Sequence, residues 1–165
     1  MDPDHRPPRP IDGPEKPMLE SFLDFQRQTL LWKVSGLDEA ALRCPWVPSG
    51  TSLLGLVQHL AYVERWWFQG VFAGREVVIP WRAAEPTDEW QLDPNQTSAS
   101  VLAFYRAEVA QSRQITAASS LDQRARLPER PHTLRRVLIH MIEETARHVG
   151  HADILRELTD GATGE

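Results

Sequence analysis

Residues 133–158 read TLRRVLIHMIEETARHVGHADILREL, and they carry the clearest periodicity in the chain. Seven of these residues recur at alternating steps of four and three, the spacing that places side chains on one face of an α-helix. They are Leu134, Leu138, Met141, Thr145, His148, Ala152 and Leu155. All except His148 suit a packed core. The pattern therefore predicts a long helix with one buried face and a histidine in the middle of that face.

Two more polar side chains lie near His148 on this predicted helix. Glu144 is one turn before it and His151 is one turn after it, each within about 6 Å along the helix axis. A buried ionisable group must be paired, hydrogen-bonded or bound to a metal, because desolvating it alone costs several kcal/mol. Imidazole and carboxylate at positions i and i+4 commonly provide two ligands for zinc or nickel. The alternative interpretation is a buried, hydrogen-bonded histidine network without a metal.

A third ligand would have to come from another helix. Residues 52–72 read SLLGLVQHLAYVERWWFQGVF, with apolar side chains on more than one side, which is typical of a deeply buried helix. His59 lies at the edge of the main apolar face of this helix. We therefore predict a metal site built from His59, His148 and Glu144. His151 is the last-ranked candidate ligand.

The remaining chain predicts an all-α fold. Apolar periodicity indicates two further long helices, from residue 18 to about Gly36 and over residues 97–118, and a short helical turn over residues 38–42. Residues 1–17 hold six prolines and are expected to form a flexible leader before one domain over residues 18–165. Four long helices with one long crossover connection predict a four-helix bundle, a fold that binds metals through side chains on facing helices.

The predicted crossover covers residues 75–95 and contains Trp81 and Trp90. A connection of this length often covers a site or a partner surface. Two interpretations of the tryptophans stay open, since they could anchor the loop or contact a substrate.

Composition limits the classes of function. The chain has 165 residues, a net charge of −5 and 41% hydrophobic residues, which fits one domain with an apolar core. We expect a cytoplasmic protein without a membrane partner, because no apolar run approaches roughly 20 residues and no signal peptide is recognisable. The lack of a basic run argues against nucleic acid. The single cysteine, Cys44, excludes an internal disulfide and a multi-cysteine zinc site.

Two segments carry a resemblance to a known family. The segments are QHLAYVERWWF around His59 and EETARHVGHADILRE around His148. They resemble the DinB/YfiT-like superfamily of metal-binding four-helix bundles, specifically its DUF664-type branch. The resemblance covers residues 18–161. It implies a divalent metal bound by one histidine on the second helix, matched by His59, and an H-x-x-x-H pair on the last helix. His148 matches the second histidine of that pair, and Glu144 replaces the first.

The replacement of histidine by Glu144 affects which metal ion the site is expected to bind. The related mycothiol-dependent maleylpyruvate isomerases also use a histidine, a glutamate and a histidine. A carboxylate is a harder ligand than imidazole, so manganese or iron are alternatives to zinc or nickel. His151 stands where relatives commonly have glutamine, and could be a fourth ligand, a support for another ligand or a proton carrier.

The expected function follows from the open positions of a three-ligand site, which are typical of catalytic metals. The resemblance implies a thiol S-transferase or isomerase that uses a low-molecular-weight thiol of mycothiol type and a small-molecule substrate. A metal-dependent hydrolase is one alternative, in which His151 or Glu144 handles protons as a catalytic residue. The other is a non-catalytic metal- or ligand-binding stress-response bundle. Superfamily members commonly dimerise, so a homodimer is expected.

Overall fold

A computed structural model describes residue 6, residues 9–82 and residues 90–163. In these ranges the chain is built of helices and loops, with no β-strand beyond an isolated bridge between Arg124 and Thr133. The predicted all-α fold class is confirmed. Parts of the predicted leader, residues 1–5 and 7–8, and part of the predicted crossover, residues 83–89, lie outside the described residues.

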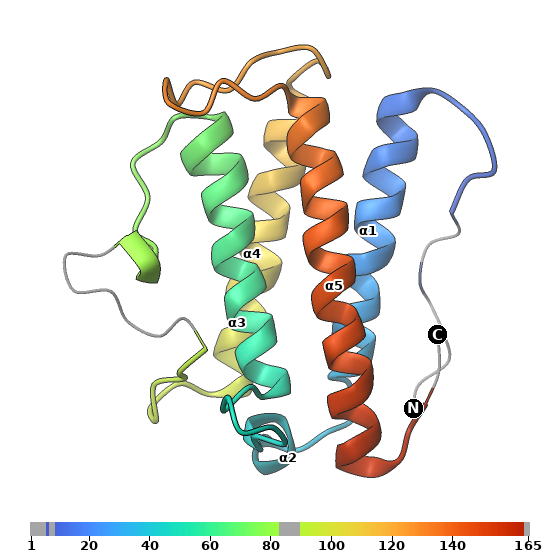
Figure 1. Ribbon diagram of the computed structural model, residues 1–165, viewed down its shortest axis with the longest axis vertical. Coiled ribbons are helices and arrows are strands. Elements are labelled where there is room, and N and C mark those ends of the chain that lie inside the picture. The colour runs from blue at the N-terminus through green and yellow to red at the C-terminus, as the bar shows by residue number, and fades with distance from the viewer. Residues whose placement is uncertain (1–5, 7–8, 83–89, 164–165) are drawn as a thin grey trace.

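Four long helical segments lie side by side (Figure 1). They are α1 (Glu15–Lys33), α3 (Leu53–Glu64) with its continuation η1 (Arg65–Phe72), α4 (Ser98–Ala117) and α5 (Leu134–Asp160). Helix α1 packs on α5, and α3 packs on both α4 and α5. Two short helices, α2 (Glu39–Arg43) and η2 (Pro80–Arg82), belong to the connections. Among the described residues, no helix has both the length and the apolar character needed to cross a bilayer.

Local side-chain chemistry sets most helix ends. At the N-termini of α2, α3, α4 and α5, a polar side chain accepts a hydrogen bond from the backbone N–H three residues later. These capping residues are Asp38, Ser52, Thr97 and Thr133. Gly161 caps the C-terminus of α5, and its left-handed φ of 76° suits a glycine. The predicted starts of the last three long helices agree with the structure.

Helix α1 begins earlier than predicted, at Glu15 instead of Met18. Its first turn contains Pro17, and Pro14 precedes it. Proline is tolerated there because the first backbone N–H groups of a helix have no intrahelical partner. The prolines that indicated a leader therefore do not prevent the helix from starting.

The second predicted helix changes type along its length. Its last eight residues, η1, form a π-helix, and the backbone N–H of Ala73, which follows η1, donates to the carbonyl of Phe68 (2.9 Å). Within η1, a Cβ at Gly70 would lie only 2.8 Å from the ring of Trp66. The wider turn and the glycine together make room for that indole. Apolar periodicity did not reveal this, because the same residues would also be buried on an α-helix.

The core contains two clusters of buried apolar residues with a polar layer between them. All seven residues of the predicted buried face of α5 are buried, which confirms the pattern from which the helix was predicted. On that helix Thr145 and His148 lie between Met141 of one cluster and Val149 of the other. On α1, Arg27 occupies the corresponding position, between apolar neighbours from the two clusters. The helical core therefore carries buried polar groups between its two apolar clusters.

Candidate metal centre

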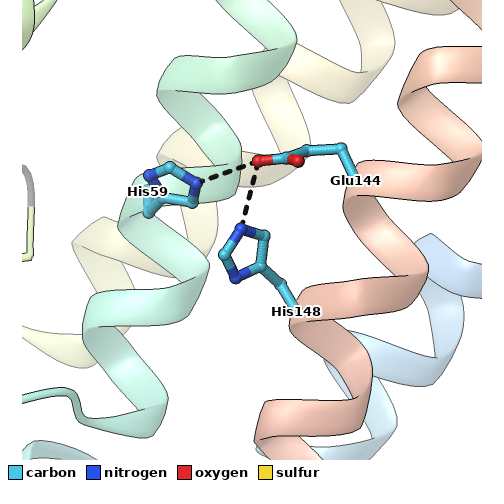
Figure 2. A group of neighbouring side chains, drawn as sticks. All are labelled: His59, Glu144 and His148. Atoms are coloured by element: carbon cyan, nitrogen blue, oxygen red, sulfur yellow. Dashed lines mark hydrogen bonds and ion pairs between the residues drawn. The ribbon is translucent and has the colours of Figure 1, made fainter.

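Three of the four predicted site residues converge between α3 and α5. His59 comes from α3, and Glu144 and His148 lie one turn apart on α5 (Figure 2). The Oε1 atom of Glu144 lies 3.1 Å from Nε2 of His148 and 3.5 Å from Nε2 of His59. The centroids of the two imidazole rings are 4.6 Å apart. One carboxylate oxygen therefore sits between two imidazole nitrogens that belong to different helices.

The separation of these three groups suits a shared ion. One ligand atom from each residue lies within 4.8 Å of the other two. Donor atoms held about 2.1 Å from one zinc ion are roughly 3–4 Å from each other, so small side-chain movements would bring all three to one ion. In the part of the chain that the structure describes, this is the one such group of three histidine, cysteine or carboxylate side chains.

Burial and hydrogen bonding define the charge of the site. His59 and His148 are 6% and 7% exposed, and Glu144 is half-buried. The pKa of the Glu144 carboxyl is held well below its ordinary value by the hydrogen bond with His148, and then by the one with His59, while burial opposes the shift. The group is therefore an anion at neutral pH. It can supply a charged oxygen ligand beside two nitrogen ligands.

The donor set fits a divalent metal ion. The atoms that face one another are Nε2 of His59, Nε2 of His148 and Oε1 of Glu144, so these are the atoms that could bind one ion. Two imidazoles and one carboxylate form a ligand set found in catalytic zinc sites, where the remaining positions stay open. The carboxylate also makes the site acceptable to harder ions such as manganese.

The structure does not bring His151 into this group. Its side chain is exposed, and its ring centroid lies 5.4 Å from that of His148. Three residues along a helix turn the side chain by about 60° from the buried direction. His151 therefore borders the metal centre on the solvent side. A role as ligand or catalytic proton carrier stays a prediction.

Trp90 contacts the site, and Trp81 lies near it. The Trp90 ring stacks on His59, with centroids 4.2 Å apart and planes 20° apart, and its centroid is 5.5 Å from that of His148. The Trp81 ring centroid is 6.3 Å from that of His59. The connection between η1 and α4 thus covers a candidate ligand. The sequence did not decide whether the tryptophans anchor the loop or contact a substrate. In the structure, Trp90 contacts His59 directly.

Helix α3 itself holds Trp90 in this place. The side-chain amide of Gln58, next to His59, donates to the carbonyl of Gln91 (3.0 Å). One turn earlier, Gly55 permits close approach, since a Cβ there would lie 3.0 Å from the Trp90 carbonyl oxygen. A glycine inside an apolar helical segment is a sequence signal for close backbone approach. That signal was available in the stretch LLGLV, but it did not identify the partner.

Comparison with known proteins identifies a family. A family model described as mycothiol-S-transferase matches residues 18–161, which is most of the chain. The expected DinB/YfiT-like relationship, and the range over which it was expected, are confirmed. No curated protein matches the chain.

Proposed function

The chain belongs to the mycothiol-S-transferase family, and we propose that it is a metal-dependent enzyme acting with a low-molecular-weight thiol of mycothiol type. The sulfur would form a bond to an electrophilic carbon of a small molecule, either displacing a leaving group or assisting an isomerisation. The observation that carries this proposal is the convergence of His59 and His148, from two helices, on the carboxylate of Glu144. Zinc or nickel is the proposed ion, with manganese or iron as alternatives.

Each residue has a distinct part in the proposal. His59, Glu144 and His148 would hold the ion, because all three project from helices that keep them in place. A bound divalent ion lowers the pKa of a thiol or water at an open position, so that a nucleophile is available near neutral pH. Trp90 covers one face of His59 and limits the access of water to it.

Proton handling is better assigned to His151 than to Glu144. The hydrogen bonds that depress the pKa of the Glu144 carboxyl also make it a weak base. His151 is exposed beside His148, so a proton taken up there can leave to solvent. Imidazole is the side chain best suited to proton transfer near neutral pH.

Metal content tests the ligand assignment. The protein should be purified without a histidine tag and its metal content measured for His59→Ala, Glu144→Gln and His148→Ala. We expect His148→Ala to lose stoichiometric metal, because only two donors remain. His140→Ala is the matched control, since His140 lies two turns before His148 on α5, its ring centroid is 4.4 Å from that of Trp67, and it is not one of the three grouped candidate ligands. Stoichiometric metal retained by His148→Ala would disprove the assignment.

Turnover separates the proposed enzyme from its alternatives. Mycothiol, bacillithiol and glutathione should each be offered with an electrophile, and thiol consumption followed. Consumption that stops on chelation and returns with added metal supports the S-transferase. Ester or amide cleavage without any thiol would identify a hydrolase. Metal-dependent stabilisation without turnover would identify a non-catalytic bundle, and sedimentation of the same preparation tests the predicted homodimer.

A further inference from the structure

A group of rings lies beside the candidate metal centre, toward the start of α5. His140 is one turn before Glu144 on this helix, about 6 Å along the axis. The ring centroid of Trp67, on η1, lies 4.4 Å from that of His140 and 5.8 Å from that of His132. All three rings are only partly buried. The contact between η1 and α5 next to the metal centre is therefore lined by rings that solvent can still reach.

Two arginines lie near these rings. Arg130 belongs to the connection between α4 and α5, which passes over the end of η1 and the start of α5 (Figure 1). Its guanidinium carbon lies 5.7 Å from the centroid of the Trp67 ring. Arg136 is one turn before His140 on α5, and the pKa of the His140 imidazole is lowered first by burial and then by the charge of Arg136. Two positive charges therefore lie on this side of the metal centre.

No carboxylate of the described chain neutralises these two charges. Arg130 and Arg136 are both exposed, and in the described ranges neither forms an ion pair. Two carboxylates act on the neighbouring His140, and both are already engaged. Glu144 belongs to the candidate metal centre, and Glu143 lies 3.6 Å from an arginine one turn later on α5. Uncompensated positive charge therefore borders the metal centre in a chain whose net charge is −5.

The chemistry of these side chains suits an anionic ligand. A guanidinium binds a carboxylate through two parallel N–H groups. Because burial and Arg136 lower its pKa, the His140 imidazole is neutral at neutral pH and still donates one N–H. We propose that Arg130, Arg136 and His140 bind a carboxylate of the electrophilic substrate and so hold its reactive carbon at the metal centre. The inference rests on the proposed function, because it assigns a substrate class, carboxylate-bearing electrophiles, to the same site.

Two electrophiles that differ in charge test the proposal. They are the chlorodinitrobenzoate with chlorine para to the carboxylate, and its primary amide. In both, the thiolate sulfur bonds to the ring carbon, chloride leaves and the thiol proton passes to solvent. With the metal-loaded natural chain and mycothiol, we expect a higher kcat/KM for the benzoate than for the amide, each measured relative to its uncatalysed rate.

Variants of the positive side chains should remove this preference. We expect Arg136→Gln to reduce it about fivefold, the upper range for an exposed ion pair. The double variant with Arg130→Gln should reduce it further, and His140→Ala should reduce it while keeping its metal. Arg106→Gln is the matched control, because it removes an exposed arginine from α4, and it should keep the preference of the natural chain.

Binding of an unreactive anion gives a readout that does not depend on turnover. Dinitrobenzoate without the chlorine should bind the natural chain more tightly than dinitrobenzamide in calorimetric titration at low ionic strength, and Arg136→Gln should weaken only the binding of the benzoate. If this pattern holds while neither electrophile consumes thiol, the proposed enzyme is wrong and the anion site is supported.

Three outcomes would overturn the inference. The first is equal binding of dinitrobenzoate and dinitrobenzamide by the natural chain. The second is an equal loss in Arg136→Gln and Arg106→Gln, which would indicate a general charge effect. The third is weaker binding of the thiol by Arg136→Gln with an unchanged preference between the electrophiles, which would assign the positive charges to the thiol.

Discussion

At the scale of single residues, the imidazole of His59 is held on two sides. Its ring stacks on Trp90 at 4.2 Å, and its Nε2 lies 3.5 Å from the Glu144 carboxylate. A ligand whose ring is already oriented loses less side-chain freedom when it binds an ion. We therefore expect the stacking to contribute to the affinity of the proposed metal centre without any contact between Trp90 and the ion.

Replacing Trp90 tests this contribution. A stacked aromatic pair contributes about 1 kcal/mol, so we expect Trp90→Ala to weaken metal binding roughly fivefold, as measured by competition with a chelator. Trp46→Ala is the control, since Trp46 is 43% exposed and its indole N–H donates to Thr159 at the end of α5. Gly55→Ala should act in the same direction as Trp90→Ala, because its Cβ would press on the Trp90 carbonyl. Unchanged affinity in Trp90→Ala would contradict the role.

At the scale of helices, a buried ion pair joins α1 to α3. Arg27 donates from Nε and Nη2 to the two oxygens of Glu64, each at 2.7 Å, and both residues are at most 3% exposed. Glu64 is the last residue of α3 before the π-helix. Arg27 has a second partner, Asp24, at 2.9 Å. The pair therefore fixes the alignment of α1 against α3 at the height where the helix changes type.

Single and double replacements measure the value of this pair. Arg27→Met leaves the Glu64 carboxylate buried without this partner, and we expect a loss of about 3–5 kcal/mol in the free energy of unfolding by urea. Glu64→Leu should cost less, because Arg27 keeps Asp24. The double variant should recover much of the loss, since an apolar pair needs no solvation. Additive losses in the double variant would show that the two residues are not coupled.

At the scale of the whole molecule, the candidate metal centre joins side chains from two helices that are far apart in sequence. His59 lies on α3, and the other two candidate ligands, Glu144 and His148, lie on α5. An ion that binds all three therefore binds the folded chain much more tightly than the unfolded chain. Binding of this kind must stabilise the fold by mass action.

Thermal unfolding measures that coupling. With free zinc or nickel at about one hundred times the dissociation constant, the stabilisation is about 2.7 kcal/mol, which raises Tm by roughly 5–10 °C for a chain of this size. His148→Ala should show no such rise, whereas His140→Ala should show it in full. If chelation leaves the Tm of the metal-loaded protein unchanged, the proposed link between two helices is wrong.

Sequence periodicity and capping were enough to predict the long helices and most of the side chains of the candidate metal centre. The buried face of α5 follows from residue spacing alone, because the 3.6-residue turn is a property of the local backbone. Three of the long helices start where Ser52, Thr97 and Thr133 offer side-chain caps, which is also local chemistry. Glu144 and His148 are brought together by a single turn of one helix.

Contacts between distant segments needed the folded chain. The stacking of Trp90 on His59 and the pairing of Arg27 with Glu64 each join residues from different elements. Periodicity tells which side of a helix is buried, but not which helix or loop packs against that side or at what height. That choice depends on how all the side chains fill the interior together, so it is made only when the helices pack.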